Sequence, residues 1–137
     1  MMCKYNDKDI PIMNNSEQVR NLLEIYFDAF YHVNLDALSV ILHEAVHVYG
    51  HDEDGMLRDT TKETFLDILG GFKSHNENPN FVRNDEILSI DFASEDIAVA
   101  RVRLSFDDSI CTDILSLIRL NNEWRVISIL DSRMSVS

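Results

Sequence analysis

The chain has 137 residues and a formal net charge of −12, with 45% hydrophobic and 26% charged residues. This length fits a single domain that can bury a core without disulfides or a structural metal. The acidic excess argues against a nucleic-acid or membrane partner, because both surfaces attract clustered Lys and Arg. It is compatible with a neutral ligand, or with an anion held by a local arginine.

The N-terminal residues and the cysteines predict where the protein resides. Residues 1–15 are polar and predict a flexible tail ahead of a single domain over residues 16–137. No apolar run is long enough for a signal peptide or a membrane helix. Cys3 and Cys111 give no particular support for a disulfide, which fits a reducing compartment. We therefore expect a cytoplasmic protein.

The first half of the domain predicts three helices. Residues 19–30 carry apolar side chains at helical spacing, with Asn15 or Ser16 as the N-cap. A second, shorter helix follows Asn34. Capping and stop signals frame a third helix over residues 60–70.

Strand patterns fill the rest of the domain. Residues 46–50 favour a strand, and an Asp-Gly turn leads to a returning strand over residues 56–59. Further on, apolar residues alternate with a period of two along four segments, residues 88–92, 98–106, 110–120 and 124–130. Helices followed by a strand meander predict an α+β fold, with three N-terminal helices on one face of a curved antiparallel sheet.

One segment matches the zinc-protease pattern H-E-x-x-H, namely His43-Glu44-Ala45-Val46-His47. In that mechanism a helix points both histidines at one zinc, with the glutamate as general base. Here Val46 and the residues after it favour a strand, where side chains four apart lie about 13 Å apart. We therefore treat a zinc metalloprotease as a remote alternative and expect no metal. The structural alternative is that His43 ends the second helix and Glu44 is a solvated turn residue.

Three polar residues are candidates for acid–base catalysis: His47, Tyr49 and Asp113. His47 and Tyr49 share one face of the predicted strand, and imidazole titrates near neutral pH. Asp113 alternates with apolar neighbours, and such burial suits a carboxyl group to proton transfer. The alternatives are structural. His47 and Tyr49 can be half-buried with satisfied hydrogen bonds, and Asp113 can form an ion pair with Arg101 or Arg103, although these two lie opposite the apolar face of their strand.

Aromatic residues predict the lining of a ligand pocket. The proposed lining consists of Tyr26, Phe27, Phe30, Phe65 and Trp124. Such aromatic residues more often form a core. In a conical fold the two roles overlap, because core residues near the open end also line the cavity.

The order of elements, two helices, a short hairpin, a helix and four long strands, resembles the nuclear-transport-factor-2-like superfamily. Residues 38–55, 61–69 and 111–128 are most similar to its SnoaL-like and lumazine-binding-like branches. The resemblance implies a cystatin-like cone with a cavity at its open end, in a superfamily of isomerases, dehydratases, cyclases and binding proteins. In the related ketosteroid isomerases a catalytic aspartate lies on the first hairpin, and Tyr49 occupies that place here.

We therefore expect a small-molecule-binding domain for an apolar or aromatic ligand, without a cofactor. Its catalytic form would be a metal-independent acid–base enzyme, such as a cyclase, dehydratase or isomerase. The alternative is a non-catalytic ligand-binding or dimerisation module. A homodimer would form through the outer face of the sheet, made apolar by Ile97 and Val99, or by Ile127 and Ile129.

Overall fold

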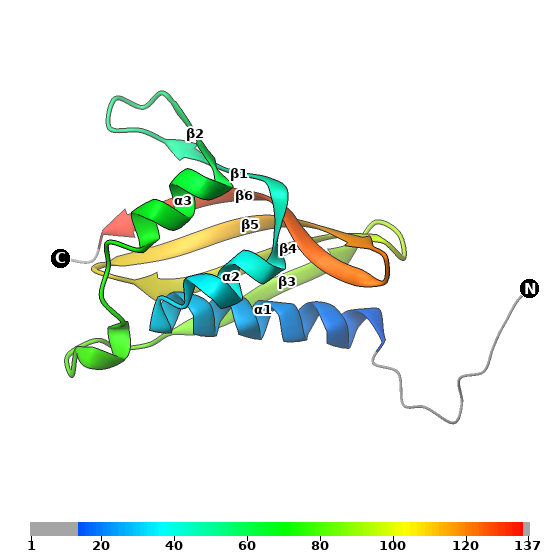
Figure 1. Cartoon of the computed structure of the whole chain (residues 1–137), viewed down its shortest axis with the longest axis horizontal. Helices are drawn as coiled ribbons and strands as arrows, with labels where there is room; N and C mark the ends of the chain where they lie inside the picture. Colours follow the sequence, from blue (N-terminus) through cyan, green and yellow to red (C-terminus); the bar gives the residue numbers. More distant parts are fainter. Residues whose placement is uncertain (1–13, 136–137) are drawn as a thin grey trace, which may run out of the picture.

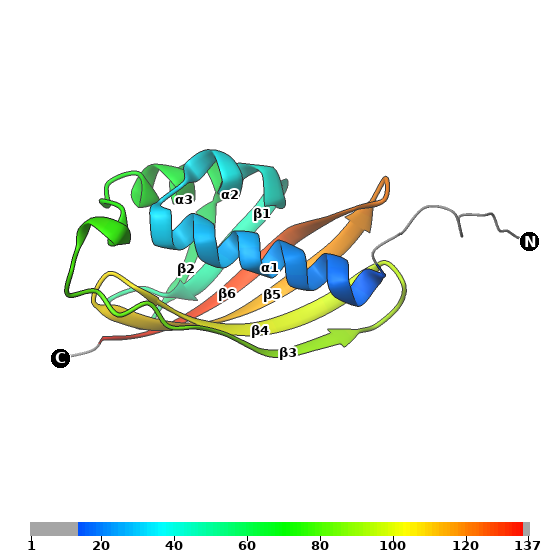
Figure 2. The same cartoon turned by 90° about the horizontal axis from the view of Figure 1, so that it is seen from below.

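Three helices cover one face of a six-stranded sheet in the computed structural model, which describes residues 14–135. Figures 1 and 2 show the helices together on that face. In chain order the elements are α1 Asn15–His32, α2 Leu35–Ile41, β1 Leu42–His51, β2 Leu57–Thr61, α3 Lys62–Leu69, a 3-10 turn η2 His75–Glu77, β3 Asp85–Phe92, β4 Ile97–Phe106, β5 Ser109–Leu120 and β6 Glu123–Ser135. The predicted α+β architecture is confirmed.

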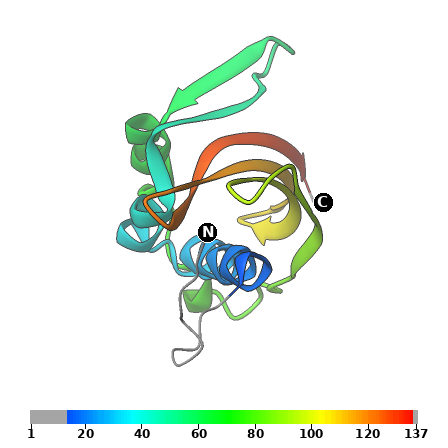
Figure 3. The ribbon, with the colours of Figure 1, turned by 90° about the vertical axis from the view of Figure 1, so that its right-hand side faces the viewer.

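The sheet has the strand order β2-β1-β6-β5-β4-β3. β1 runs parallel to β6, and all other neighbours are antiparallel. Viewed along the long axis of the molecule, the sheet curls around the helices (Figure 3). Curvature of this kind makes the sheet and helices enclose a cone-shaped interior, and the buried apolar side chains form one core cluster there.

The N-terminus of α1 is fixed by a capping box. The side chain of Asn14 accepts from the backbone N–H of Glu17 at 2.9 Å, and the Glu17 carboxylate accepts from the Asn14 N–H at 3.2 Å. The cap therefore lies just before the predicted Asn15 or Ser16. Most of the predicted tail, including Cys3, lies outside the described residues, whereas Cys111 is buried on β5. Within the described range, no helix combines the length and apolar character needed to cross a membrane.

A buried lysine joins α2, β1 and α3. Lys62 Nζ donates to the Ser39 and Leu42 carbonyls, both at 2.9 Å, and to Glu44 Oε1 at 2.8 Å. Its three donors thus satisfy acceptors that the end of α2 and the start of β1 would otherwise leave open. We call these three hydrogen bonds the Lys62 clamp. The clamp lies where the chain changes from helix α2 to strand β1.

A β-bulge in β6 changes which of its side chains face the core. Leu117 pairs with Val126, but Ser116 pairs with Ser128, so Ile127 is an extra residue on β6. Beyond the bulge the alternation is reversed, because each face takes every second residue. Ile129 is therefore buried, with 1% exposure, and the prediction that it faces outward is wrong.

Candidate functional site

A small cavity of about 30 Å³ lies inside the cone, near the C-terminal end of β6. Most of its wall is apolar and comes from α1, α3, β1, β4 and β6; these residues are Phe30, Val48, Phe65, Leu69, Leu104 and Phe106, with Ile129. Four residues add polar atoms, namely Tyr26, Cys111, Asp113 and Asp131. A mainly apolar wall with a few convergent polar groups is the usual composition of a small-molecule site.

The innermost polar contact joins α1 to β5. The Tyr26 hydroxyl donates to Asp113 Oδ2 at 2.7 Å, in a buried environment where Tyr26 is fully covered and Asp113 is 5% exposed. Burial raises the pKa of the Tyr26 phenol well above its usual value, and the neighbouring Asp113 and Asp131 carboxylates raise it further. At neutral pH Tyr26 is therefore a neutral hydrogen-bond donor.

Asp131 lies directly across the β5–β6 ladder from Asp113. Its Oδ2 accepts from Arg58 Nη2 at 3.2 Å, whereas its Oδ1 is buried with no hydrogen-bond partner in the described part of the chain. Gly50 makes the Arg58 contact possible, because a Cβ at position 50 would overlap the guanidinium and approach the Asp131 carbonyl oxygen to 3.1 Å. The glycine thus provides the space in which the guanidinium rests.

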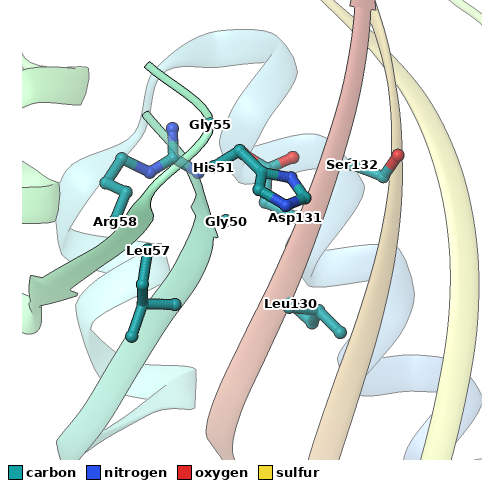
Figure 4. Close-up of a pocket in the computed structure, with 8 residues that line it drawn as sticks. All are labelled: Gly50, His51, Gly55, Leu57, Arg58, Leu130, Asp131 and Ser132. Carbon is teal, nitrogen blue, oxygen red and sulfur yellow. The ribbon is translucent and has the colours of Figure 1, made fainter. Parts of the chain in front are cut away.

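An open cleft of about 610 Å³ adjoins this cluster, between the β1–β2 hairpin and the end of β6. Its lining residues are Gly50, His51, Leu57, Arg58, Leu130 and Asp131, with Gly55 and Ser132 (Figure 4). Asp131 contributes to both the cleft and the inner cavity. Asp131 therefore lies between the two spaces.

Three of the five predicted pocket residues line the cavity: Tyr26, Phe30 and Phe65. Phe27 is buried in the core but is displaced around α1 from Tyr26, since successive helical residues differ by about 100°. Trp124 follows the β5–β6 turn and packs on Phe92. Figure 1 shows this turn at one end of the molecule and the C-terminal end of β6 at the other. Phe27 and Trp124 therefore do not line this cavity.

The three predicted catalytic residues do not converge. Asp113 points into the cone, but His47 and Tyr49 alternate with the buried Val46 and Val48 and face away from the helices. His47 Nδ1 contacts Asp59 Oδ1 at 2.5 Å, and its ring stacks on Tyr49 with a centroid separation of 5.9 Å. The geometry thus separates an inner site at Asp113 from an outer pair at His47 and Tyr49.

The H-E-x-x-H segment is part of strand β1, which begins at Leu42, earlier than the predicted Val46, so the helix that the zinc mechanism needs is not formed. Each side chain has its own partner. His43 Nδ1 accepts from the Ala45 N–H at 2.9 Å, Glu44 binds Lys62, and His47 binds Asp59. Hydrogen bonding by Lys62, together with its charge, lowers the pKa of Glu44. Contrary to expectation, His43 lies in the strand and Glu44 is ion-paired.

Arg101 and Arg103, the predicted ion-pair partners of Asp113, do not lie on its face of the sheet. Asp113 pairs across the ladder with Val102, on the inner face. Arg101 and Arg103 occupy the outer face, where Arg103 Nη1 lies 3.4 Å from Glu86 Oε1. Among the described residues, no group of three or more His, Cys, Asp and Glu side chains is arranged to hold a metal ion.

Sequence reasoning missed Asp131, Arg58 and Gly50. Arg58 lies on the short returning strand that the sequence predicts, where it pairs with Gly50. A glycine within a strand is a signal that another group approaches the backbone closely. Asp131 gave no such signal, because the bulge at Ile127 changes its face.

The helices, the curled sheet and the cavity at one end define a nuclear-transport-factor-2-like fold. The family described as "Putative lumazine-binding" matches residues 14–130, and the chain belongs to this lumazine-binding-like branch of the superfamily. No curated protein matches the sequence significantly.

Solved structures share the fold at low sequence identity. An NTF-2 like protein of unknown function from Silicibacter pomeroyi DSS-3 is 22% identical, with 89% of this chain and 100% of that chain covered and a TM-score of 0.76. One from Shewanella baltica OS155 is 17% identical, with 87% and 93% covered and a TM-score of 0.77. A ketosteroid isomerase-like protein from Erwinia carotovora atroseptica SCRI1043 is 14% identical, with 86% and 95% covered and a TM-score of 0.65.

Proposed function

We propose that this protein binds a small, largely apolar or aromatic molecule at the open end of the cone. The observation that carries the proposal is the buried Tyr26–Asp113 hydrogen bond of 2.7 Å in the wall of an otherwise apolar cavity. Burying a polar pair costs desolvation free energy. A role in binding a ligand would explain why the core keeps this pair. The name of the family supports a small-molecule ligand with a ring system of the lumazine type.

The volumes of the cavity and the cleft support a ligand with two parts, a small polar group and a larger body. The cavity of about 30 Å³ accommodates one small polar group, whereas the cleft of about 610 Å³ has the size of an ordinary ligand site. The body of the ligand would lie in the cleft beside Gly50 and Leu57. Its polar group would reach past Asp131 toward Tyr26 and Asp113.

A metal-independent acid–base step is the catalytic form of this proposal. Asp113 is the residue that the geometry favours, since it faces the cavity and its hydrogen bond to Tyr26 fixes its orientation. His47 and Tyr49 lie on the other face of the sheet and stay predictions for a separate outer role.

The experiment that tests the binding proposal is a screen of small aromatic and heterocyclic fragments, including neutral pteridine-like rings, followed by ¹H–¹⁵N NMR. We expect some fragments to shift the amide signals of Gly50, Arg58 and Asp131 in a saturable manner. Saturable shifts confined to the outer-face residues His47 and Tyr49, or no saturable shift with any fragment, would contradict the proposal.

A second candidate role, a dimerisation module, is favoured by the outer face of the sheet. Ile97, Val99, Ile114 and Leu130 are each 38–51% exposed there, and Ile114 pairs directly with Leu130 across the ladder. The partner that we propose is a second copy of this chain. The same face carries Arg101 and Arg103 beside Glu86, so a two-fold pairing can place opposite charges together.

A further inference from the structure

The polar cluster at the cavity consists mainly of hydrogen-bond acceptors. Tyr26 uses its hydroxyl proton on Asp113, so its oxygen offers the ligand lone pairs. Asp113 and Asp131 are acceptors when ionised. Arg58 has donors, but its Nη2 is engaged with Asp131 Oδ2 at 3.2 Å. A ligand group that donates hydrogen bonds therefore fits this cluster better than one that accepts them.

The charges at the site point to the same kind of group. Two carboxylates, Asp113 and Asp131, line the cavity, and Arg58, whose side chain is 38% exposed at the mouth, contacts Asp131. Asp131 Oδ1 is buried without a hydrogen-bond partner in the described residues. A buried carboxylate oxygen is costly unless a donor, preferably a cationic one, meets it.

Aromatic rings around the cavity would also favour a cation. Phe30 lies at the centre of a cluster in which its ring centroid is 4.8 Å from Tyr26, 5.6 Å from Phe106 and 6.1 Å from Phe65. Ring faces attract ammonium groups, and the attraction grows when the cation is removed from water. The rings and carboxylates together form an environment that is apolar in its walls and negative at its polar end.

We propose that the polar group of the ligand is a protonated amine or amidine, carried on a small aromatic or apolar body. This inference rests on the proposed function and names its ligand class. The N–H groups donate to Asp131 Oδ1, while the body occupies the cleft beside Gly50 and Leu57. Arg58 stays at the mouth, where solvent screens its repulsion of the ligand.

The test uses three probes with one aromatic body and different charges: 2-phenylethylamine, 2-phenylethanol and phenylacetate. Each is titrated into the full-length protein, and the dissociation constant is obtained from the amide shifts of Gly50 and Asp131. We expect the amine to bind about tenfold or more tightly than the other two, because a charge-assisted hydrogen bond forms with a shielded carboxylate. Equal or tighter binding of the alcohol or the carboxylate would overturn the inference.

Two variants locate the effect. Asp131→Asn should remove most of the preference for the amine, whereas Asp67→Asn, the same change at an exposed position on α3, should leave it intact. If Asp131→Asn does not fold, Arg58→Gln decides the question. Loss of the Arg58 cation should preserve or strengthen binding of the amine. If Arg58→Gln instead weakens amine binding and specifically abolishes phenylacetate binding, the site is an anion site.

The inference and the proposed function fail in different ways. If none of the three probes binds, the inference is wrong, but neutral heterocycles from the fragment screen can still bind at Gly50, Arg58 and Asp131. If the fragments also fail there, the proposed function is wrong as well.

Discussion

Tyr26 has a strongly perturbed environment in the inner site. Its phenol is fully buried and donates to Asp113, and a second carboxylate, Asp131, lies nearby. Each of these features opposes loss of the phenol proton, with burial as the largest cause of the raised pKa. The hydroxyl therefore orients Asp113, and through it the polar end of the cavity.

Replacement of Tyr26 by Phe should lower the free energy of unfolding by about 1–3 kcal/mol, because Asp113 Oδ2 loses a buried donor. The measurement is urea denaturation followed by fluorescence, near pH 8. A change of less than a few tenths of a kcal/mol would show that the hydrogen bond does not form in solution.

Wild type and Tyr26→Phe together also test the raised pKa of Tyr26. Since the folded-state pKa lies above the usual value of 10.0, the contribution of the phenol is fully present below about pH 10. As the pH rises further the unfolded phenol ionises first, so wild type should lose stability more steeply than Tyr26→Phe. Denaturation curves at about pH 8 and about pH 11 should therefore show a smaller gap at the higher pH. A constant gap would mean that the phenol is not perturbed.

Gly50 is the second residue on which the site depends, since its missing side chain leaves room for the Arg58 guanidinium. Gly50→Ala should destabilise the protein by about 1–2 kcal/mol, because the guanidinium must leave Asp131. In an Arg58→Ala background most of this loss should disappear, since the overlapping atoms are gone. Thermal denaturation of the four proteins of this cycle measures the coupling, and purely additive losses would contradict the proposed contact.

At the scale of elements, the junction of α2, β1 and α3 depends on Lys62. Lys62→Met keeps the aliphatic stem but removes three hydrogen bonds, two of them to backbone carbonyls. We expect a loss of about 2–3 kcal/mol in the free energy of unfolding. Glu44→Gln is the matched control and should cost much less, because the Glu44 side chain is 90% exposed and the carbonyl contacts remain. Equal losses would mean that the ion pair, and not the carbonyl contacts, holds the junction.

Most elements could be predicted from local patterns. The helical spacing from Val19 to Phe30 and the alternation from Ala98 to Phe106 each report which side of an element is buried, and both were confirmed. Asp113 was also identified, because its strand alternates without interruption from Cys111 to Leu117. Local periodicity is sufficient where an element is regular.

The rest of the site depends on features that periodicity does not contain. An extra residue at Ile127 moves Asp131 to the inner face, and the parallel pairing of β1 with β6 brings Gly50 close to it. Arg58 reaches Asp131 across 73 positions of sequence. Such contacts follow from strand order and register, which one sequence without its fold does not reveal.

At the scale of the whole molecule, the two faces of the curled sheet differ in the residues that they carry. The inner face carries the cavity, while the outer face carries exposed apolar residues and the His47–Asp59 pair. With a net charge of −12, association of two copies needs local apolar contact and charge complementarity to outweigh long-range repulsion. The dimer proposal therefore depends on the outer face alone.

Ile114→Lys tests that proposal. Placing a charge at the centre of the outer face should convert a dimer to a monomer, whereas Ile68→Lys, at an exposed position on α3, should not. Light scattering coupled to size-exclusion chromatography gives the mass of each protein. A monomeric wild type at high concentration, or a dimer unaffected by Ile114→Lys, would contradict an interface at this face.

The most direct test of a ligand site inside the cone is a crystal structure of the protein with the fragment that binds most tightly. We predict that its body lies between the β1–β2 hairpin and the end of β6, with a polar atom within hydrogen-bond distance of Asp131. A fragment bound instead against His47 and Tyr49, with the Tyr26–Asp113 pair shielded and unchanged, would contradict the account.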